Sequence, residues 1–323
     1  QGERAIGVVL SGMGSDGTLG LQAMKAQGGL TLAQTPESAQ FDSMPNSVIN
    51  AGFADIIATP AELPGRILAV IAHKPEVQQL PQDNAELADT PSDALQQVVV
   101  QLQRHTRHDF SAYKSSTLLR RIERRMAIHA IESLPDYAAF LPDNPQEIDL
   151  LFKELLIGVT NFFREPAVWQ HLSEVVLPEL LQHHMDTKAI RAWCVGCSTG
   201  EEACSLAITF CEVVQQHSEF DGFSLQIFAS DLSLDAITSA RRGQYPLTIA
   251  EHVSAERLER FFIRHDHCYQ IKQAVRDMIL YAQHDVILDP PFTRLDLIVC
   301  RNLLIYFDTM LQRRLLPLFH YSL

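Results

Sequence analysis

Three things are scarce in this sequence: cysteine, long apolar runs and positive charge. No apolar run reaches the roughly 18 residues that a membrane-spanning helix needs, and no signal-peptide pattern opens the chain, so we expect no membrane insertion. The formal net charge is −13, which makes the chain a poor candidate for nonspecific binding to nucleic acid. We therefore expect no nucleic-acid partner, and any anionic partner needs a local basic patch.

The six cysteines are too few for a disulfide scaffold in a chain of 323 residues. Cys194 and Cys197 form a CxxC pair, but a metal site would need further ligands at a suitable spacing. Cys204 and Cys211 follow on a predicted helix, and Cys211 lies in an apolar stretch. We predict buried, reduced thiols and no metal site, and a cytoplasmic protein.

The composition, 46% hydrophobic, is that of a globular protein with two or more packed domains. Residues 1–73 have an α/β pattern, and residues 74–93 form a predicted linker with three prolines and five acids. Residues 94–160 are predicted to be helical, and residues 161–323 to form an α/β domain. Because the chain opens abruptly on an apolar run and stops without a closing element, we expect a fragment of a longer protein.

A helix predicted over residues 117–129 separates apolar from basic side chains. At 100° per residue, Leu118, Leu119, Ile122 and Met126 fall on one side. The other side carries Arg120, Arg121, Arg124 and Arg125. Such a focused patch can steer an anionic partner, although a solvated helix face explains the same composition.

From about residue 161 onward, strand and helix patterns alternate. The strand runs are AIRAWCV (189–195), SLQIFASD (224–231) and RLDLIVCRN (294–302). Such alternation predicts a parallel sheet with helices on its faces. Residues 259–286 break the pattern with two β-rich runs around a polar middle, and we interpret them as a small antiparallel insertion.

The stretch CVGCSTGEE (194–202) is predicted to end the first of these strands, make an open turn and begin a helix near Thr199. Small residues there let a ligand approach the backbone N–H groups of the helix start. A pyrophosphate would suit such a turn, but Glu201 and Glu202 would repel it. The two acids favour a ligand with a cationic near end, such as an ammonium or a sulfonium. Complementarity to the helix dipole would explain them equally well if they stood alone.

The next strand ends at Asp231, where an acid commonly accepts hydrogen bonds from ribose hydroxyls. Asp231 lies further from Gly196 than the roughly 20 residues expected of a dinucleotide fold, and the pattern GxGxxG is missing. Capping of the next helix would explain Asp231 if it stood alone. Together with the acidic turn, it favours a nucleoside that carries a cation and no pyrophosphate, which describes S-adenosylmethionine (SAM).

Four ordered motifs resemble those of the chemotaxis receptor methyltransferases, the CheR family. They are TNFFRE (160–165), CSTGEE (197–202), FASDLS (228–233) and CRNLLIYFD (300–308). The resemblance covers residues 95–323. It implies a Rossmann-like α/β methyltransferase domain with a small antiparallel insertion, preceded by a small helical domain. The family's sheet continues beyond the point where this chain stops, so we expect a C-terminally truncated domain.

The resemblance also implies a SAM site. Its residues are Thr160, Arg164, Gly196, Glu201 and Glu202 at the methionine end, Asp231 at the ribose, Asp285 and Val286 at the adenine, and Arg301, Asn302 and Tyr306 in the cleft. Arg164 is expected to pair with the SAM carboxylate, and Tyr306 to lie near the methyl group and orient the attacking oxygen. This chain has Gly158 and Asp285 where many members have asparagine, although an acid can still accept from the adenine amine.

The first 73 residues resemble another family, the C-terminal part of the receptor methylesterases (CheB). The motif MGSDG makes Asp16 the third member of that family's Ser-His-Asp triad. The serine and histidine lie earlier in that family and are missing here. Since a lone acid cannot generate a nucleophile, we expect an α/β methylesterase-like fragment without esterase activity, in a fused esterase–transferase.

The resemblance implies methyl transfer to glutamate side chains on the helical cytoplasmic region of chemotaxis receptors. We expect the enzyme to be monomeric. A glutamate with a pKa of about 4.3 is already a carboxylate at pH 7, so no general base is needed. The task of the enzyme is then to align the reacting atoms and to exclude water. The helix with Arg120, Arg121, Arg124 and Arg125 is expected to bind the acidic receptor.

Two other functions stay open. A nicotinamide-dependent enzyme on a Rossmann sheet is opposed by the Glu201–Glu202 pair and by the missing GxGxxG. A non-catalytic module that senses SAM or docks receptors is opposed by the four intact motifs, and SAM binding without methyl transfer would support it.

Overall fold

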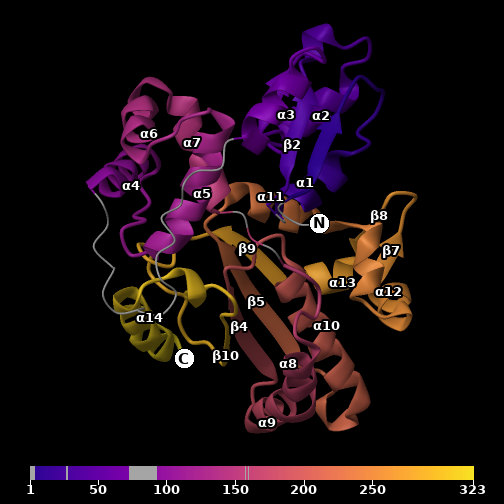
Figure 1. Cartoon of the computed structure of the whole chain (residues 1–323). Helices are drawn as coiled ribbons and strands as arrows, with labels where there is room; N and C mark the ends of the chain where they lie inside the picture. The colour runs from indigo at the N-terminus through magenta and orange to yellow at the C-terminus, as the bar shows by residue number, and fades with distance from the viewer. Residues whose placement is uncertain (1–3, 27, 73–92, 157, 159) are drawn as a thin grey trace. The chain divides into compact units, whose positions relative to one another are not determined.

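The computed structural model describes residues 4–26, 28–72, 93–156, 158 and 160–323 (Figure 1). The chain divides into two compact units, one within residues 1–159 and one within residues 160–323. Residues 74–92 of the predicted linker lie outside the described residues. No helix among the described residues is long and apolar enough to cross a membrane.

The first unit begins with a three-stranded parallel sheet in the order β1-β2-β3. The central strand β2 is buried along its whole length, as expected of a strand with neighbours on both sides and helices over it. The predicted α/β pattern of this part is confirmed. Its elements are β1 (Ile6–Val9), α1 (Thr18–Ala26), β2 (Leu30–Gln34), α2 (Ser43–Asn50), β3 (Ile56–Ala58) and α3 (Leu63–Ala72).

The second part of this unit is helical, as predicted. Its helices are α4 (Asp93–Thr106), α5 (Ser115–Ile128), α6 (Leu134–Phe140) and α7 (Pro145–Leu155). They surround a core that includes Val98 and Leu102 of α4 and Ile122 of α5, all fully buried. At the end of α5, Ile128 packs against the cluster of Leu30, Leu32 and Ile56 in the three-stranded sheet, so the two parts share apolar contacts.

One arginine of α5 points into the helical core. Arg125 is 1% exposed, and its Nε and Nη2 donate to the two carboxylate oxygens of Glu147 at 2.8 and 2.5 Å. Tyr137 Oη donates to the same carboxylate (2.7 Å), and His129 lies beside it. Burial alone would raise the pKa of Glu147, but hydrogen bonds, led by those from Arg125, hold that pKa at about 2. The prediction that Arg125 lies on the exposed basic face is therefore wrong, because its guanidinium is buried and pairs with Glu147 inside the core.

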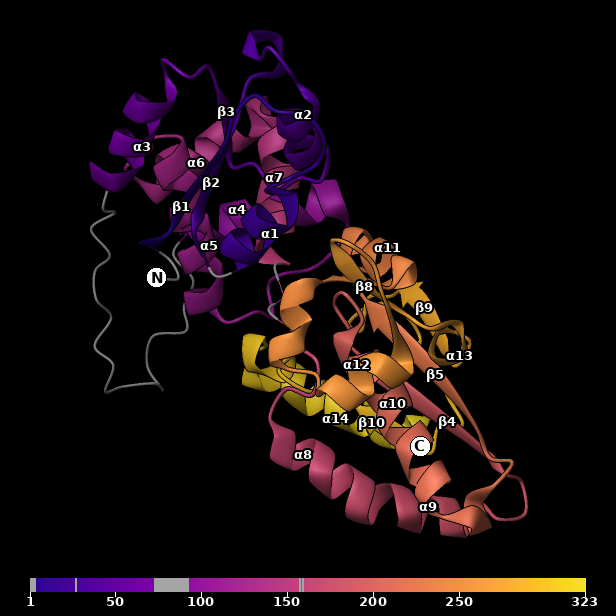
Figure 2. The ribbon, with the colours of Figure 1, turned by 90° about the vertical axis from the view of Figure 1, so that its right-hand side faces the viewer.

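The second unit contains a four-stranded parallel sheet in the order β10-β4-β5-β9 (Figures 1 and 2). From β4 the chain adds β5 and β9 on one side and then returns to place β10 on the other. Strands β4 and β5 have the predicted bounds, and the Rossmann-like α/β fold is confirmed. The strands are β4 (Ala189–Val195), β5 (Ser224–Asp231), β9 (Ile279–Gln283) and β10 (Leu297–Val299).

Helices precede, join and follow these strands. The first helical segment has three continuous parts, of which the middle one, Leu172–Val176, is a π-helix. Its outer parts are α8 (Pro166–His171) and α9 (Leu177–His183). The other helices are α10 (Glu201–Gln216), α11 (Leu234–Arg242), α12 (Ala255–Phe261), α13 (Gln273–Arg276) and α14 (Thr309–Ser322).

A second, three-stranded antiparallel sheet in the order β6-β8-β7 confirms the predicted insertion. Its hairpin, β7 (Phe262–Arg264) and β8 (Cys268–Ile271), lies inside the predicted range. Two details differ. The third strand, β6 (Gln244–Pro246), comes earlier in the chain, and the run Ile279–Gln283, assigned to the insertion, is β9 of the parallel sheet.

The Arg125–Glu147 pair gives a stability prediction. Arg125→Met leaves the buried Glu147 without its bidentate arginine partner, so we expect the helical part to lose about 3–5 kcal/mol of unfolding free energy. Hydrogen exchange of the core amides of residues 93–156 would measure this loss. Arg120→Met is the matched control, since Arg120 is exposed on the same helix, and it should change the exchange little. Equal effects of the two variants would contradict the structural role of Arg125.

Candidate functional site

The predicted site residues gather at the carboxyl edge of the four-stranded sheet. Gly196 follows β4, Asp231 ends β5, Asp285 follows β9 and Arg301 follows β10. In open α/β sheets, ligands bind outside the carboxyl ends of the strands, where the strand order reverses. Here that reversal falls between β4 and β10, so the topology brings these four segments to one place.

The turn after β4 has a left-handed backbone at alternating positions. Gly196, Ser198 and Gly200 have φ angles of +70°, +48° and +94°. A Cβ on Gly200 would also lie 2.8 Å from Tyr281 Oη, so this position accepts only glycine without a local shift. Helix α10 begins at Glu201, directly after Gly200 and within two residues of the predicted start near Thr199.

Asp231 holds this turn against the end of β5. Its carboxylate accepts the backbone N–H groups of Ser198 and Ser233, each at 2.9 Å. Burial raises the pKa of Asp231, and the backbone donors partly offset the increase. The next helix, α11, is capped by Ser233, whose hydroxyl accepts from the backbone of Ala236 (3.2 Å). The side-chain cap of α11 is therefore Ser233, and Asp231 instead joins the turn after β4 to the residue that caps α11.

The two acids at the start of α10 have different surroundings. Glu202 pairs with Arg301 (Oε2 to Nη1, 3.2 Å), and the thiol of Cys194 donates to its other oxygen (3.5 Å). Glu201 accepts from the hydroxyl of Thr199 at 2.7 and 2.9 Å, and no ion pair between described residues includes it. Burial raises the pKa of Glu201 to about 7, with the Thr199 hydroxyl opposing the increase. The site thus holds a carboxylate whose charge lacks a cationic partner from the described chain.

Arg301 connects the switch point to the segment 160–165. Its Nη2 donates to the carbonyl oxygen of Arg164 (2.8 Å) and lies 3.2 Å from the carboxylate of Glu165, while Nη1 pairs with Glu202. The neighbouring Asn302 forms a hydrogen bond with Glu165. Arg301 therefore joins the segments that follow β4 and β10 to Arg164, and Asn302 lies beside it.

The remaining predicted residues lie on the segments next to Asp231 and Arg301. His284 donates its backbone N–H to the carbonyl oxygen of Asp231 (3.0 Å), which places the following Asp285 and Val286 next to Asp231 along the edge. The Asp285 carboxylate is buried and accepts the backbone N–H of Ile287 (2.8 Å). Tyr306 ends a 3₁₀ turn, Leu304–Tyr306, shortly after Arg301. Thr160 opens the segment that carries Arg164.

Backbone strain marks the site in a way that the sequence patterns do not. Eight residues other than glycine have positive φ angles in the described part of the chain, and four of them lie in the site segments. These four are Phe163, Glu165, Ser198 and Asn302. Left-handed backbone is costly for such residues and collects at functional sites, where the surroundings impose it. Asparagine tolerates this conformation better than most residue types. Among these four residues, Asn302 is therefore the one whose type could have indicated it from the sequence.

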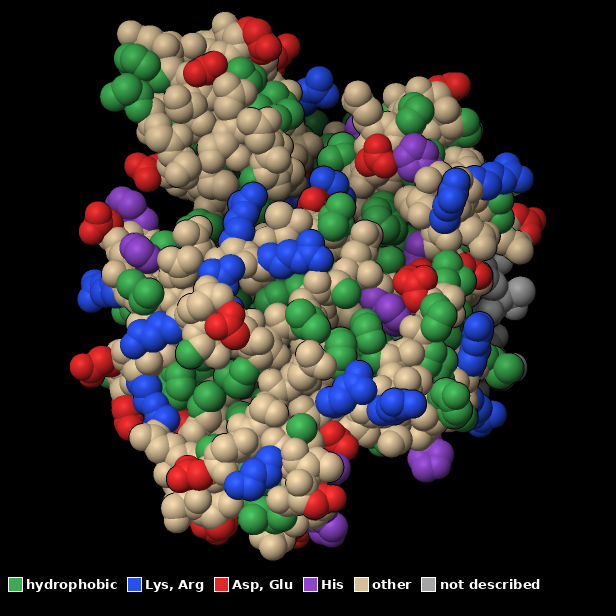
Figure 3. Space-filling view, turned by 180° about the vertical axis from the view of Figure 1, so that it is seen from behind, with side chains coloured by type: hydrophobic (Ala, Val, Ile, Leu, Met, Phe, Trp, Pro, Cys, Tyr) green, Lys and Arg blue, Asp and Glu red, His purple; other side chains and the backbone are tan. Residues whose placement is uncertain are grey.

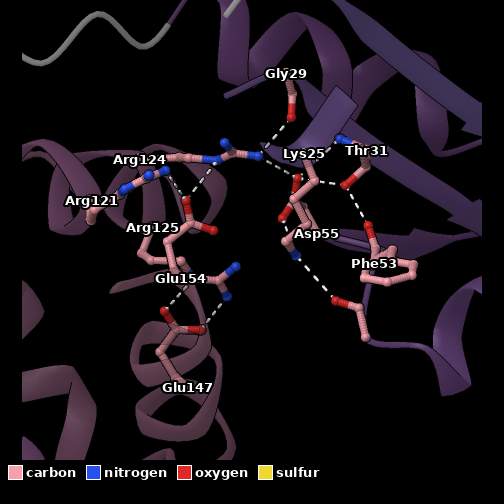
Figure 4. Close-up of polar contacts among 11 residues, drawn as sticks. Lys25, Gly29, Thr31, Phe53, Asp55, Arg121, Arg124, Arg125, Glu147 and Glu154 are labelled. Carbon is pink, nitrogen blue, oxygen red and sulfur yellow. Dashed lines mark hydrogen bonds and ion pairs between the residues drawn. The ribbon is translucent and has the colours of Figure 1, made fainter. Parts of the chain in front are cut away.

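In the first unit, two arginines on the basic side of α5 pair with acids of the same unit (Figure 4). Arg124 Nη2 donates to the Asp55 carboxylate (2.8 Å) and to the carbonyl oxygen of Gly29 (2.7 Å), both in the three-stranded sheet part. Lys25 and Thr31 contact the same carboxylate. Arg121 pairs with Glu154 (3.2 Å), whereas Arg120 is exposed. Of the four predicted arginines, only Arg120 is plainly accessible.

Lysine and arginine side chains form no single block on the face of the molecule seen in Figure 3. On that face, lysine and arginine side chains are dispersed among acidic and hydrophobic ones. Asp16, the predicted triad acid, is exposed in the turn between β1 and α1. The thiols of Cys194, Cys197 and Cys204 are free and buried, as predicted. Among the described residues, no group of three His, Cys, Asp or Glu side chains is arranged to hold a metal ion.

Comparison with known families identifies all three parts of the chain. Residues 158–323 match the CheR methyltransferase SAM binding domain, and residues 93–156 match the CheR methyltransferase all-alpha domain. The chain belongs to the CheR methyltransferase family. Residues 1–67 match a second family, the CheB methylesterases, so this CheR chain carries part of an esterase-like domain ahead of its helical domain.

Individual relatives agree with this assignment. An uncharacterized 104.1 kDa protein of Rhodobacter capsulatus is 37% identical over 99% of this chain, which spans 35% of that relative. Chemotaxis protein methyltransferase 2 of Pseudomonas aeruginosa is 32% identical over 72% of this chain and 82% of its own length. A chemotaxis protein methyltransferase of Listeria monocytogenes is 31% identical over 62% of this chain and 73% of its own length.

Proposed function

We propose that this chain transfers a methyl group from SAM to glutamate side chains of chemotaxis receptors, in the cytoplasm. The proposal is carried by two acids at the carboxyl edge of the sheet. Glu201 has no cationic partner among the described residues, and Asp231 accepts the backbone N–H of Ser198 in the turn that leads to Glu201. Relatives named chemotaxis protein methyltransferases support the receptor as substrate.

The residues of the site fit SAM. An ammonium near Glu201 would compensate the burial that raises the pKa of this carboxylate. Asp231 has lone pairs left for ribose hydroxyls after accepting two backbone N–H groups. The small turn at Gly196 lets a ligand approach, with Leu303 of the facing segment as its neighbour. When bound, SAM would supply an activated methyl group on a sulfonium.

The chain's own task is then to position the reactants. Thr160 and Arg164 are proposed to hold the methionine end, with Arg164 pairing with its carboxylate. Asp285 and Val286 are proposed to meet the adenine. Tyr306 is proposed to orient the attacking glutamate oxygen, which is already ionised at neutral pH and needs no base.

The basic side of α5 is proposed to meet the acidic receptor helix. Arg120 is exposed and is therefore the first contact that an anionic partner would find. Arg124 is held by Asp55, so a receptor carboxylate that used Arg124 would have to replace this internal partner. Arg125 takes no part, because Glu147 encloses its charge.

The esterase-like fragment is proposed to be inactive as an esterase. Its triad acid Asp16 is exposed in a turn, and the sequence supplies no serine–histidine pair of the kind that the triad needs. A methylated receptor incubated with this chain alone should keep its methyl esters. Release of methanol by the chain would contradict this part of the proposal.

Methyl transfer itself tests the proposed function. With labelled SAM and a receptor cytoplasmic fragment, we expect alkali-labile label on receptor glutamates. Arg164→Ala should lower kcat/KM by about 10- to 100-fold, because a charge-assisted pair to the SAM carboxylate is lost. Arg264→Ala, an exposed arginine in the insertion, should leave the rate unchanged. Binding of SAM without any labelled receptor would show a sensing module instead of an enzyme.

The pKa of Glu201 predicts how cofactor affinity depends on pH. The ionised form binds the ammonium, and in the free protein this form is lost as the pH falls through about 7. The Kd of S-adenosylhomocysteine should therefore rise by about tenfold between pH 8 and pH 6, since each pH unit below the pKa removes ionised carboxylate tenfold. Glu201→Gln should bind weakly at pH 8 with a nearly flat profile. Identical slopes for both proteins would contradict the role of Glu201.

A further inference from the structure

The segment 160–165, which carries Arg164, has no regular secondary structure to hold it in place. Two of its residues, Phe163 and Glu165, have left-handed backbone, with φ of +50° and +57°. Such conformations persist in non-glycine residues only where the surroundings impose them. The backbone N–H of Phe163 donates to the hydroxyl of Ser205 on α10 (3.0 Å), which is one such constraint.

A second constraint comes from an arginine almost a hundred residues later in the chain. The guanidinium carbon of Arg257, on α12, lies 4.0 Å from the centroid of the Phe163 ring. That ring is buried, and its neighbour on another side is Trp169, at 5.8 Å and 80°. The Phe163 ring therefore packs between the guanidinium of Arg257 and the indole of Trp169. Both contacts stabilise the ring in this buried position.

Arg257 is itself fixed. Its Nε and Nη2 donate to the two carboxylate oxygens of Glu212 on α10, each at 2.8 Å. This bidentate pair sets the plane of the guanidinium, and a plane held by a carboxylate is available to stack on a ring. Because Nε and Nη2 are held by Glu212 and the guanidinium lies over the Phe163 ring, we infer that Arg257 acts through Phe163.

The same insertion contacts the cofactor site at two further points. Phe162, the residue before Phe163, packs edge to face against Tyr245 of β6 (4.8 Å) and Phe262 of β7 (5.4 Å). The hydroxyl of Tyr245 donates to the carbonyl oxygen of Thr199, in the turn before Glu201 (3.2 Å). The antiparallel insertion and α12 thus support both segments that are proposed to hold the methionine end of SAM.

From these contacts we propose that Arg257 is a positioning residue: by stacking on Phe163, it holds the left-handed backbone from which Arg164 projects. The proposal rests on the proposed function of Arg164, since it is the placement of this residue that Arg257 controls. It assigns α12 and the insertion a role in positioning the segment 160–165.

The test compares three variants in the full chain. Arg257→Ala removes the stacked cation, Arg257→Lys keeps a charge for Glu212 but loses the planar group, and Arg260→Ala is the control. Arg260 lies on the same helix but stacks on Phe261 instead of on the segment 160–165. The measurements are the Kd of S-adenosylhomocysteine, the KM for SAM and kcat of methyl transfer, and hydrogen exchange at the Phe163 amide.

Arg257→Ala should raise the Kd and the KM for SAM by about three- to tenfold, as expected for loss of one desolvated cation–π contact. Arg257→Lys should fall in between, and Arg260→Ala should match the wild type. The Phe163 amide should exchange faster only in the Arg257 variants. A lower melting temperature for Arg257→Ala with unchanged Kd, KM and Phe163 exchange would overturn the proposal and leave Arg257 a structural residue.

The exchange measurement needs no cofactor, so it separates the two hypotheses. If the wild type binds no S-adenosylhomocysteine, the proposed function fails on its own, whatever the Arg257 variants do. Unchanged Phe163 exchange in Arg257→Ala would reject the positioning role even where the wild type binds and transfers methyl groups.

Discussion

The candidate site depends on the contacts made by the guanidinium of Arg301. From its place after β10, it pairs with Glu202 after β4 (3.2 Å), pairs with Glu165 (3.2 Å) and donates to the carbonyl oxygen of Arg164 (2.8 Å). A planar group with five donors suits such a junction. Because Arg301 pairs with Glu202, the neighbouring Glu201 is left without a cationic partner among the described residues, and we propose that this property selects a positively charged ligand.

Both units use arginines to join parts that are distant in sequence. In the second unit, Arg257 holds Phe163 from the far side while Arg301 holds the next residues from the switch point. In the first unit, Arg124 connects the helical CheR part to Asp55 of the esterase-like part, and Ile128 packs beside this polar contact. The helix that we propose to meet the acidic receptor is thus also the helix that contacts the esterase-like part.

The elements with strong local signals were predictable from sequence. Strands β4 and β5 are apolar runs ended by small or acidic residues, and they have the predicted bounds. The residues predicted at the switch point follow from the chain order of strands, glycines and acids. The motifs that resemble the CheR family predict roles that spacing alone does not supply, such as those proposed for Thr160 and Tyr306.

The features that could not be predicted from the sequence depend on contacts between residues that are distant along the chain. Arg125 has the same spacing as its exposed neighbours, and only Glu147 from another helix makes it a core residue. Strand β6 is three residues long and includes a proline, so its pattern is too short to predict. The pairing of Glu202 with Arg301 joins residues 99 positions apart, and the left-handed backbone of Phe163 is imposed by Ser205 and Arg257.

The central claim is that the carboxyl edge of this sheet binds a nucleoside that carries a cation. Calorimetric titration of the purified chain with S-adenosylhomocysteine tests it most directly, repeated on Asp231→Ala and on Asp266→Ala, an exposed acid in the insertion. We expect saturable binding by the wild type and by Asp266→Ala, and its loss in Asp231→Ala. Equal binding by all three proteins, or no binding by a folded wild type, would contradict the site described for this chain.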